Sequence, residues 1–168
     1  MKDLLIVDGY NIINQWPELK SLYSQSMEKA REKLIEYFIS YRELNNCEVI
    51  VVFDGKQSKI KDVQKITKYV SVIFSSEDQT ADTVIEKIVY DEKKNKRNVF
   101  VATSDLHQQF STFGNGAARI SAREIKNEIS SFMDEVKKDI KKRNMRNLPF
   151  SVEDMLPSDV VEKIRKKL

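Results

Sequence analysis

Three short apolar runs in this chain each lead into an aspartate at their C-terminal end. They are residues 4–7 before Asp8, residues 49–53 before Asp54, and residues 99–102 shortly before Asp105. Runs of four or five apolar residues, rich in valine and isoleucine, are typical of strands buried on both faces of a parallel sheet. Ligands of open α/β sheets bind at the carboxyl ends of such strands. We therefore expect the three carboxylates to lie at one functional edge.

The rest of the chain alternates further strands with helices. Residues 27–44 carry apolar side chains at spacings of three and four, which is typical of an amphipathic helix. Residues 70–74 read as another strand, and a long helix should begin at Ser121, where Glu124 gives capping-box spacing. This alternation predicts an α/β fold with a mainly parallel sheet and right-handed crossovers.

Two segments allow more than one interpretation. Residues 55–68 are polar, with five lysines against Asp62, and we expect a loop or a short helix there. Gly9 should permit a sharp turn after the first strand, and Trp16 before a proline should close that turn. The Trp16 side chain either packs in the core or contacts a nucleobase.

Composition limits the class of protein. The chain has 168 residues, of which 40% are hydrophobic and 33% charged, with a net charge of +3. These values suit one domain with a sizeable core. A single cysteine excludes an intramolecular disulfide and a paired-cysteine metal site. There is no signal-peptide pattern and no apolar run of about 18 residues, so we expect a cytoplasmic protein without a membrane partner.

A metal site is the chemistry that clustered aspartates favour. The candidate residues are Asp8, Asp54, Asp82 and Asp105, with Asn11, Thr103 and Ser104 beside them. Carboxylates that converge in one cleft repel each other, and a bound cation offsets this repulsion. Oxygen ligands suit Mg²⁺ or Mn²⁺. Zinc is disfavoured because the chain has one histidine and one cysteine. Such a site suits a metal-dependent nuclease.

Basic segments indicate a polyanionic substrate. Residues 137–146 hold six lysines and arginines against Asp139, and residues 93–97 hold four cations. We expect the phosphates of a polyanion to bind such segments, with contacts from Lys56, Lys59, Lys137 and Lys141. Arg119 and Arg123 should flank the acidic cleft, where they either grip a phosphate or form structural ion pairs.

Four motifs resemble those of the NYN domain, a branch of the PIN-like nuclease superfamily. They are Val7-Asp8-Gly9-Tyr10-Asn11, Val52-Phe53-Asp54-Gly55, Thr80-Ala81-Asp82 and Thr103-Ser104-Asp105. The YacP-like group is the most similar, because residues 116–124 also match it. The resemblance implies a Rossmann-like α/β/α sandwich and Mg²⁺- or Mn²⁺-dependent endoribonuclease activity. It implies that Asp8, Asn11, Asp82 and Asp105 are the acidic-site positions, with Asp54 nearby.

Together these observations predict a metal-dependent endoribonuclease that cleaves single-stranded RNA. Members of the group are linked to mRNA cleavage, in some cases on translating ribosomes, so mRNA and the ribosome are the expected partners. Asp8, Asp54, Asp82 and Asp105 are the expected metal ligands. Asn11 and Ser104 should position reacting groups, and no organic cofactor is expected. Residues 1–143 should form the nuclease domain, and residues 144–168 a linker with a short basic helix.

Two other functions fit part of the pattern. A catalytically inactive RNA- or ribosome-binding module would keep the basic segments without needing the acids. A phosphoacceptor receiver-like domain also places aspartates at strand ends. It would need an acceptor aspartate on the third strand, where this chain has Phe74-Ser75-Ser76.

Overall fold

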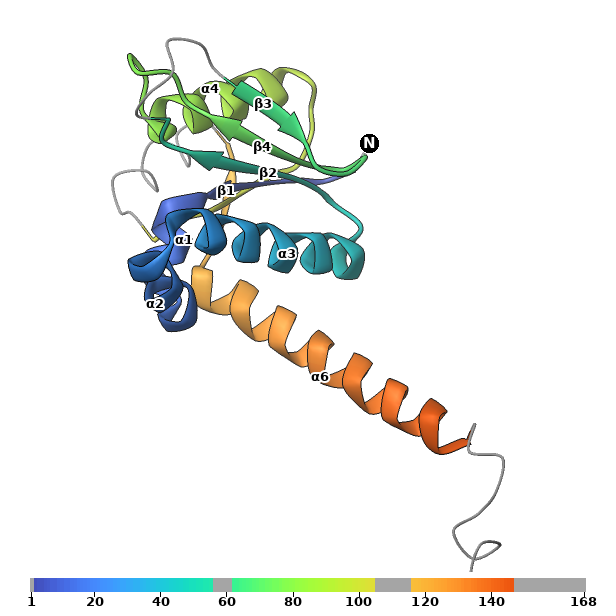
Figure 1. Cartoon of the computed structure of the whole chain (residues 1–168). Helices are drawn as coiled ribbons and strands as arrows, with labels where there is room; N and C mark the ends of the chain where they lie inside the picture. Colours follow the sequence, from blue (N-terminus) through green and yellow to red (C-terminus); the bar gives the residue numbers. More distant parts are fainter. Residues whose placement is uncertain (1, 56–61, 105–115, 147–168) are drawn as a thin grey trace, which may run out of the picture. The chain divides into compact units, whose positions relative to one another are not determined.

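The computed structural model describes residues 2–55, 62–104 and 116–146 (Figure 1). The chain divides into two compact units, Met1–Ser130 and Ser131–Leu168. The short helix predicted for the end of the chain lies outside the described residues, and the domain boundary at residue 143 stays a prediction. In the described part of the chain, no helix has both the length and the hydropathy needed to cross a bilayer.

One sheet of six strands organises the first unit. Its strands are β1 (Leu4–Asp8), β2 (Glu48–Phe53), β3 (Asp62–Lys65), β4 (Val70–Phe74), β5 (Val99–Ala102) and β6 (Ala118–Ile120). Their order across the sheet is β3-β4-β2-β1-β5-β6, and every neighbouring pair except β3 with β4 is parallel. The predicted α/β fold with a mainly parallel sheet is therefore confirmed.

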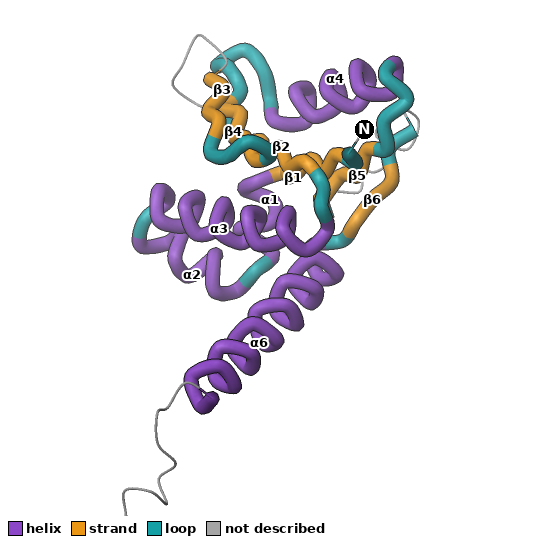
Figure 2. Tube along the Cα trace, turned by 90° about the vertical axis from the view of Figure 1, so that its right-hand side faces the viewer, coloured by secondary structure: helices purple, strands orange, loops and turns teal. Residues whose placement is uncertain are grey.

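Helices cover both faces of this sheet (Figure 2). They are α1 (Gly9–Gln15), α2 (Pro17–Gln25), α3 (Met27–Asn45), α4 (Ala81–Lys94) and α6 (Ala122–Arg146). On one face, Val7 packs in a core with Leu34 of α3 and Ile125 of α6. On the other face, Ile6 packs in a second core with Ile85 of α4. Alternate residues of β1 thus enter opposite cores, which explains why its sequence is apolar throughout.

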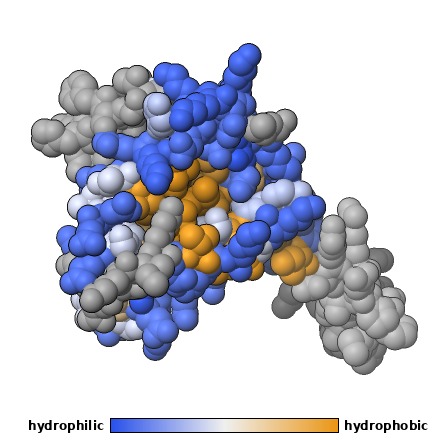
Figure 3. Space-filling view, turned by 90° about the horizontal axis from the view of Figure 1, so that it is seen from above, coloured by the Kyte–Doolittle hydropathy of each residue, from blue (hydrophilic) through white to orange (hydrophobic). Residues whose placement is uncertain are grey.

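Helix α4 covers its face of the sheet incompletely. The view onto α4 shows an apolar area framed by polar side chains (Figure 3). On this face, Val63 of β3 is 54% exposed, and Ile50 and Ile88 are only partly buried.

The segment after β1 differs from the predicted turn. Residues 9–25 form two helices, because Asp8 caps the start of α1 and Pro17 occupies the first turn of α2. Trp16 lies between these helices and is 2% exposed. Its indole Nε1 donates a hydrogen bond to the Ala122 carbonyl over 3.0 Å. The packing role of Trp16 is confirmed, and the alternative contact with a nucleobase is wrong.

The edge strand β3 is a second difference. Its four residues pair antiparallel with β4, where the sequence suggested a loop or a short helix. All four are exposed, so the apolar alternation that marks a half-buried strand is missing. Short, charged edge strands also resist pairing with other chains.

Gly9 is required for close packing, whereas the sequence suggested that it permits a sharp turn. It is the first residue of α1, and the ring of Phe53 occupies the space where a Cβ atom would lie. Phe53 is fully buried, so this ring has little room to move.

We predict that Gly9→Ala lowers the free energy of unfolding by about 1–3 kcal/mol, because the added methyl overpacks the site. Urea denaturation of the variant and the wild type measures this loss. Phe53→Leu supplies the control, since leucine lacks the ring atoms that the methyl would meet. In that background the cost of Gly9→Ala should shrink, and an equal cost in both backgrounds would contradict the packing explanation.

Candidate functional site

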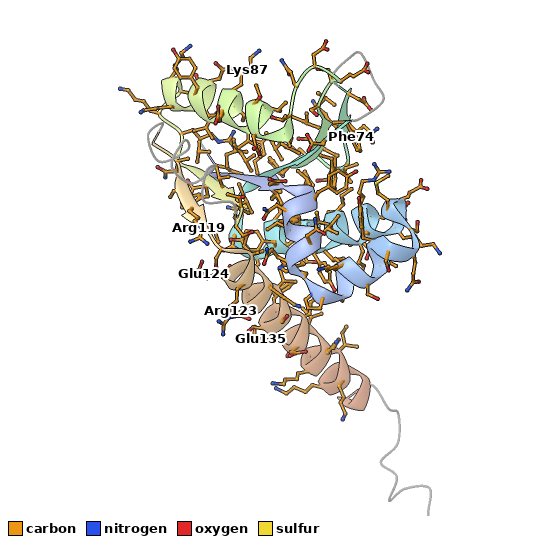
Figure 4. The ribbon with its side chains drawn as sticks, turned by 90° about the vertical axis from the view of Figure 1, so that its left-hand side faces the viewer. Phe74, Lys87, Arg119, Arg123, Glu124 and Glu135 are labelled. Carbon is orange, nitrogen blue, oxygen red and sulfur yellow. The ribbon has the colours of Figure 1, made fainter. Side chains whose placement is uncertain are left out.

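The parallel register brings the predicted site residues to one edge of the sheet. Asp8 pairs with Val52 of β2, two residues before Asp54, and Val7 pairs with Ala102 of β5, two residues before Ser104. Figure 4 faces this edge, at which β1 leads into α1.

Asp8 ends β1 and caps α1. One of its carboxylate oxygens accepts a hydrogen bond from the Asn11 backbone N–H over 3.3 Å, and the residue is partly exposed. A carboxylate at this position is stabilised by the helix dipole and satisfies an N–H that has no partner within the helix. Asp8 is therefore held at the edge with its side chain directed by the turn that follows it.

Asn11 links α1 to the segment after β5. Its Oδ1 accepts two hydrogen bonds from Ser104, one from the backbone N–H and one from the hydroxyl, each 2.9 Å long. The two residues that the sequence assigned to positioning are thus in direct contact. Because Oδ1 already serves two donors, the amide nitrogen of Asn11 is the group with hydrogen-bonding capacity to offer a substrate.

Asp54 anchors the start of α4. Its Oδ1 accepts a 2.6 Å hydrogen bond from the backbone N–H of Ala81, the first residue of that helix. Thr80 caps the same helix by accepting from the Thr83 N–H. Asp82 follows Ala81 directly and is exposed. The contact between Asp54 and Ala81 therefore fixes the backbone beside Asp82.

The described donors suit a hard cation held by few protein ligands. No group of three or more His, Cys, Asp or Glu side chains that could hold a metal occurs among residues 2–55, 62–104 and 116–146. Asp105 lies outside those residues. Mg²⁺ is commonly bound through one or two carboxylates and keeps several waters. Oxygen donors such as Asp8, Asp54 and Asp82 fit that requirement by their chemistry.

The predicted cations fall into three groups. Arg119 of β6 is exposed, and its Nε donates to the Thr103 carbonyl over 3.4 Å, at the end of β5. Arg123 is exposed in the first turn of α6 (Figure 4). Lys56 and Lys59 lie outside the described residues. Lys137 and Lys141 belong to the second unit.

The start of α6 follows the predicted capping box. Ser121 donates from its N–H and its hydroxyl to Glu124, and its Oγ accepts from the Glu124 N–H. These hydrogen bonds hold the pKa of the Glu124 carboxyl below its ordinary value, and the charge of Arg119 adds to the effect. Arg119 and Glu124 are therefore electrostatically coupled where β6 leads into α6.

The second unit carries its cations on an open helix surface. Lys137 and Lys141 are four residues apart and exposed, so they lie on one side of α6. The apolar side chains predicted for another side of this helix are also exposed within the described residues, with Val136 at 36% and Ile140 at 53%. Burial of that side ends at Ile129 in the first unit.

Sequence reasoning missed an aromatic cluster at the same edge. We define it as Tyr10, Tyr23, Phe53 and Phe74. The ring of Tyr10 lies 5.0 Å from that of Phe53 and 5.9 Å from that of Tyr23, and the rings of Phe53 and Phe74 are stacked 5.6 Å apart. A signal did exist, because Tyr10 and Phe53 lie within the acidic motifs. The contacts themselves join four separate elements.

Arg31 and Asp54 add charge to the aromatic cluster. The guanidinium of Arg31 donates to the Tyr10 hydroxyl over 3.4 Å and lies 5.4 Å from the centre of the Phe74 ring. Burial raises the pKa of the Tyr10 hydroxyl, Arg31 opposes the rise, and Asp54 adds to it. The cluster is therefore within electrostatic range of a predicted metal ligand.

Comparison with known proteins matches this architecture. The YacP-like NYN domain model matches residues 5–168. The uncharacterized protein YacP of Bacillus subtilis (strain 168) is 39% identical over 140 residues, which cover 83% of this chain and 82% of YacP.

Two crystal structures of Rae1 (YacP) from Bacillus subtilis share the fold. One superposes with a TM-score of 0.72 at 35% identity and covers 98% of this chain and 93% of Rae1. A mutant form of Rae1 gives a TM-score of 0.73 at 37% identity, covering 87% of this chain and 86% of the mutant chain. On sequence and on structure alike, this chain belongs to the YacP-like NYN domain family, a nuclease-type family.

Proposed function

We propose that this protein is a Mg²⁺- or Mn²⁺-dependent endoribonuclease that cleaves single-stranded RNA. We propose mRNA as its substrate, engaged in the cytoplasm and on the ribosome. The observation that carries the proposal is the shared edge of β1, β2 and β5, where the register of the strands brings Asp8, Asp54 and Ser104 to the same end of the sheet. Membership of a nuclease-type family supports the same activity.

In this proposal Asp8, Asp82 and Asp105 would hold the metal, with Asp54 beside them. The bound metal would lower the pKa of a water and offset charge in the phosphoryl transition state. Asn11 would keep the Ser104 hydroxyl in place through their 2.9 Å hydrogen bond. Asp54 would keep the start of α4 fixed, since it accepts from Ala81. Arg119 and Arg123 are exposed and would bind RNA phosphates.

A catalytically inactive RNA- or ribosome-binding module is the second candidate. The exposed lysines of α6 favour it, because sequence-independent RNA binding needs only positive charge. Cleavage of a labelled RNA with and without EDTA separates the two functions. Metal-dependent cleavage supports the nuclease, and binding without cleavage supports the module.

Replacing the proposed metal ligands should abolish most cleavage while the fold is kept. We expect Asp8→Asn and Asp82→Asn each to lower the cleavage rate by roughly 100-fold or more, since a metal supplies several kcal/mol of charge stabilisation. Asparagine caps a helix as well as aspartate, so Asp8→Asn should stay folded. Asp91→Asn is the matched control, because Asp91 is also exposed on α4. Wild-type cleavage rates in both site variants would contradict the proposed metal site.

Asn11→Ala should lower turnover more than metal affinity. The variant removes the acceptor of two hydrogen bonds from Ser104, which should cost roughly tenfold in rate at saturating Mn²⁺. Calorimetric titration with Mn²⁺ and single-turnover cleavage separate the two effects. Asn14→Ala on the same helix is the control, since Asn14 is exposed. Normal turnover with a large loss of Mn²⁺ affinity would contradict the positioning role.

The lysines of α6 should set the salt dependence of RNA binding. Each phosphate contact on a single strand contributes roughly −0.7 to the slope of log K against log salt, so Lys137→Gln with Lys141→Gln should flatten the slope by about 1.4. The control removes two exposed lysines of α3, Lys29 and Lys33. RNA and ribosome affinities over a salt series give both slopes. Equal changes in the two double variants would show that the α6 lysines only face solvent.

A further inference from the structure

We propose that the aromatic cluster and Arg31 form a stacking site for one nucleobase next to the scissile phosphate. This inference rests on the proposed function and adds a base-binding subsite to it. The exposure of the four rings increases from the core to the surface. Phe53 is fully buried, Tyr10 and Phe74 are partly exposed, and Tyr23 is 37% exposed. The cluster therefore continues from the core to the surface, where a ligand can reach Tyr23.

The strand order places the cluster beside the carboxylates. Phe74 ends β4, which lies two strands from β1 and Asp8, a separation of about 10 Å. Arg119 lies on β6, two strands from β1 in the other direction. Figure 4 shows Phe74 and Arg119 on opposite sides of this edge. The acidic centre thus lies between an aromatic surface and a cation, which suits an RNA strand that crosses the edge.

The chemistry of the cluster fits a base better than an aliphatic ligand. Tyr23 is 37% exposed, and its aromatic ring is a surface on which any base can stack. Phe74 is stacked against Phe53 and has Arg31 over its ring, so it supports the site from within. Arg31 adds a planar guanidinium that can stack on a base or donate hydrogen bonds to it. Its 5.4 Å separation from the Phe74 ring brings the two kinds of contact together. Such a site accepts bases by stacking and does not require one sequence.

The charges around the cluster favour a nucleotide in one orientation. Arg31 attracts a phosphate, and Asp54 repels one without its metal. When no metal is bound, a nucleotide stacked on the rings should therefore turn its phosphate toward Arg31 and away from Asp54.

A cycle of RNA and protein changes tests this site. The affinity of the full-length protein for a single-stranded RNA is measured in EDTA, with one abasic nucleotide placed at each position in turn. Wild type should lose roughly 5- to 100-fold in affinity at one abasic position, as base–aromatic stacking predicts. Tyr23→Ala should bind the intact RNA more weakly by a similar factor and lose nothing further at that position. Tyr23→Trp should restore both properties.

The matched control is Tyr90→Ala. Tyr90 is 55% exposed on α4, and the Lys94 ammonium lies 4.2 Å from the centre of its ring. Like Tyr23, it is an exposed tyrosine with a cation nearby, but it does not belong to the aromatic cluster. This variant should behave as wild type. Phe74→Leu is a second site variant, and circular dichroism checks that each variant is folded. Equal abasic losses in wild type and Tyr23→Ala, or no RNA binding by wild type, would overturn the stacking site.

The abasic-RNA binding experiment and the cleavage assay can refute the stacking site and the nuclease activity separately. Binding in EDTA needs no catalysis, so coupling between Tyr23 and one base supports stacking even if no RNA is cleaved. Metal-dependent cleavage without that coupling keeps the nuclease and removes the stacking site.

Discussion

The parallel pairing of β1 with β2 on one side and β5 on the other is the constraint on which the site depends. Asp8, Asp54 and Ser104 are far apart in sequence, and the register of these three strands brings them to one edge. The pairing is possible because β1 is apolar on both faces and enters both cores. Any slip of one residue would exchange its two faces and remove Asp8 from the edge.

Hydrogen bonds then convert this edge into a fixed arrangement. Asn11 joins α1 to the segment after β5, and Asp54 joins the end of β2 to the start of α4. The same side chains that carry the proposed chemistry therefore also hold the backbone. Substitutions here change geometry as well as charge, which is why asparagine at Asp8 is a cleaner probe than alanine.

Much of this molecule follows from local sequence patterns. The buried strands, helix α3 and the capping box of Ser121 and Glu124 have periodicities or spacings that are read directly. The two helices in residues 9–25 could not be predicted in this way, because Gly9, Asn11 and Pro17 are typical of turns. Packing of Trp16 overrides that preference. Strand β3 has no apolar alternation, and contacts between distant elements such as Arg31 and Phe74 leave no periodic signal.

The proposed function requires that a divalent cation binds where β1, β2 and β5 end. Paramagnetic broadening of backbone amide NMR signals by Mn²⁺ tests it most directly, since the effect falls steeply with distance from the ion. At low Mn²⁺ the signals of Asn11, Ala81 and Ser104 should broaden first, and excess Mg²⁺ should restore them. Signals at the opposite edge, such as those of Glu48 and Arg97, should stay sharp. Uniform broadening, or broadening that begins at the opposite edge, would contradict a cation site where β1, β2 and β5 end.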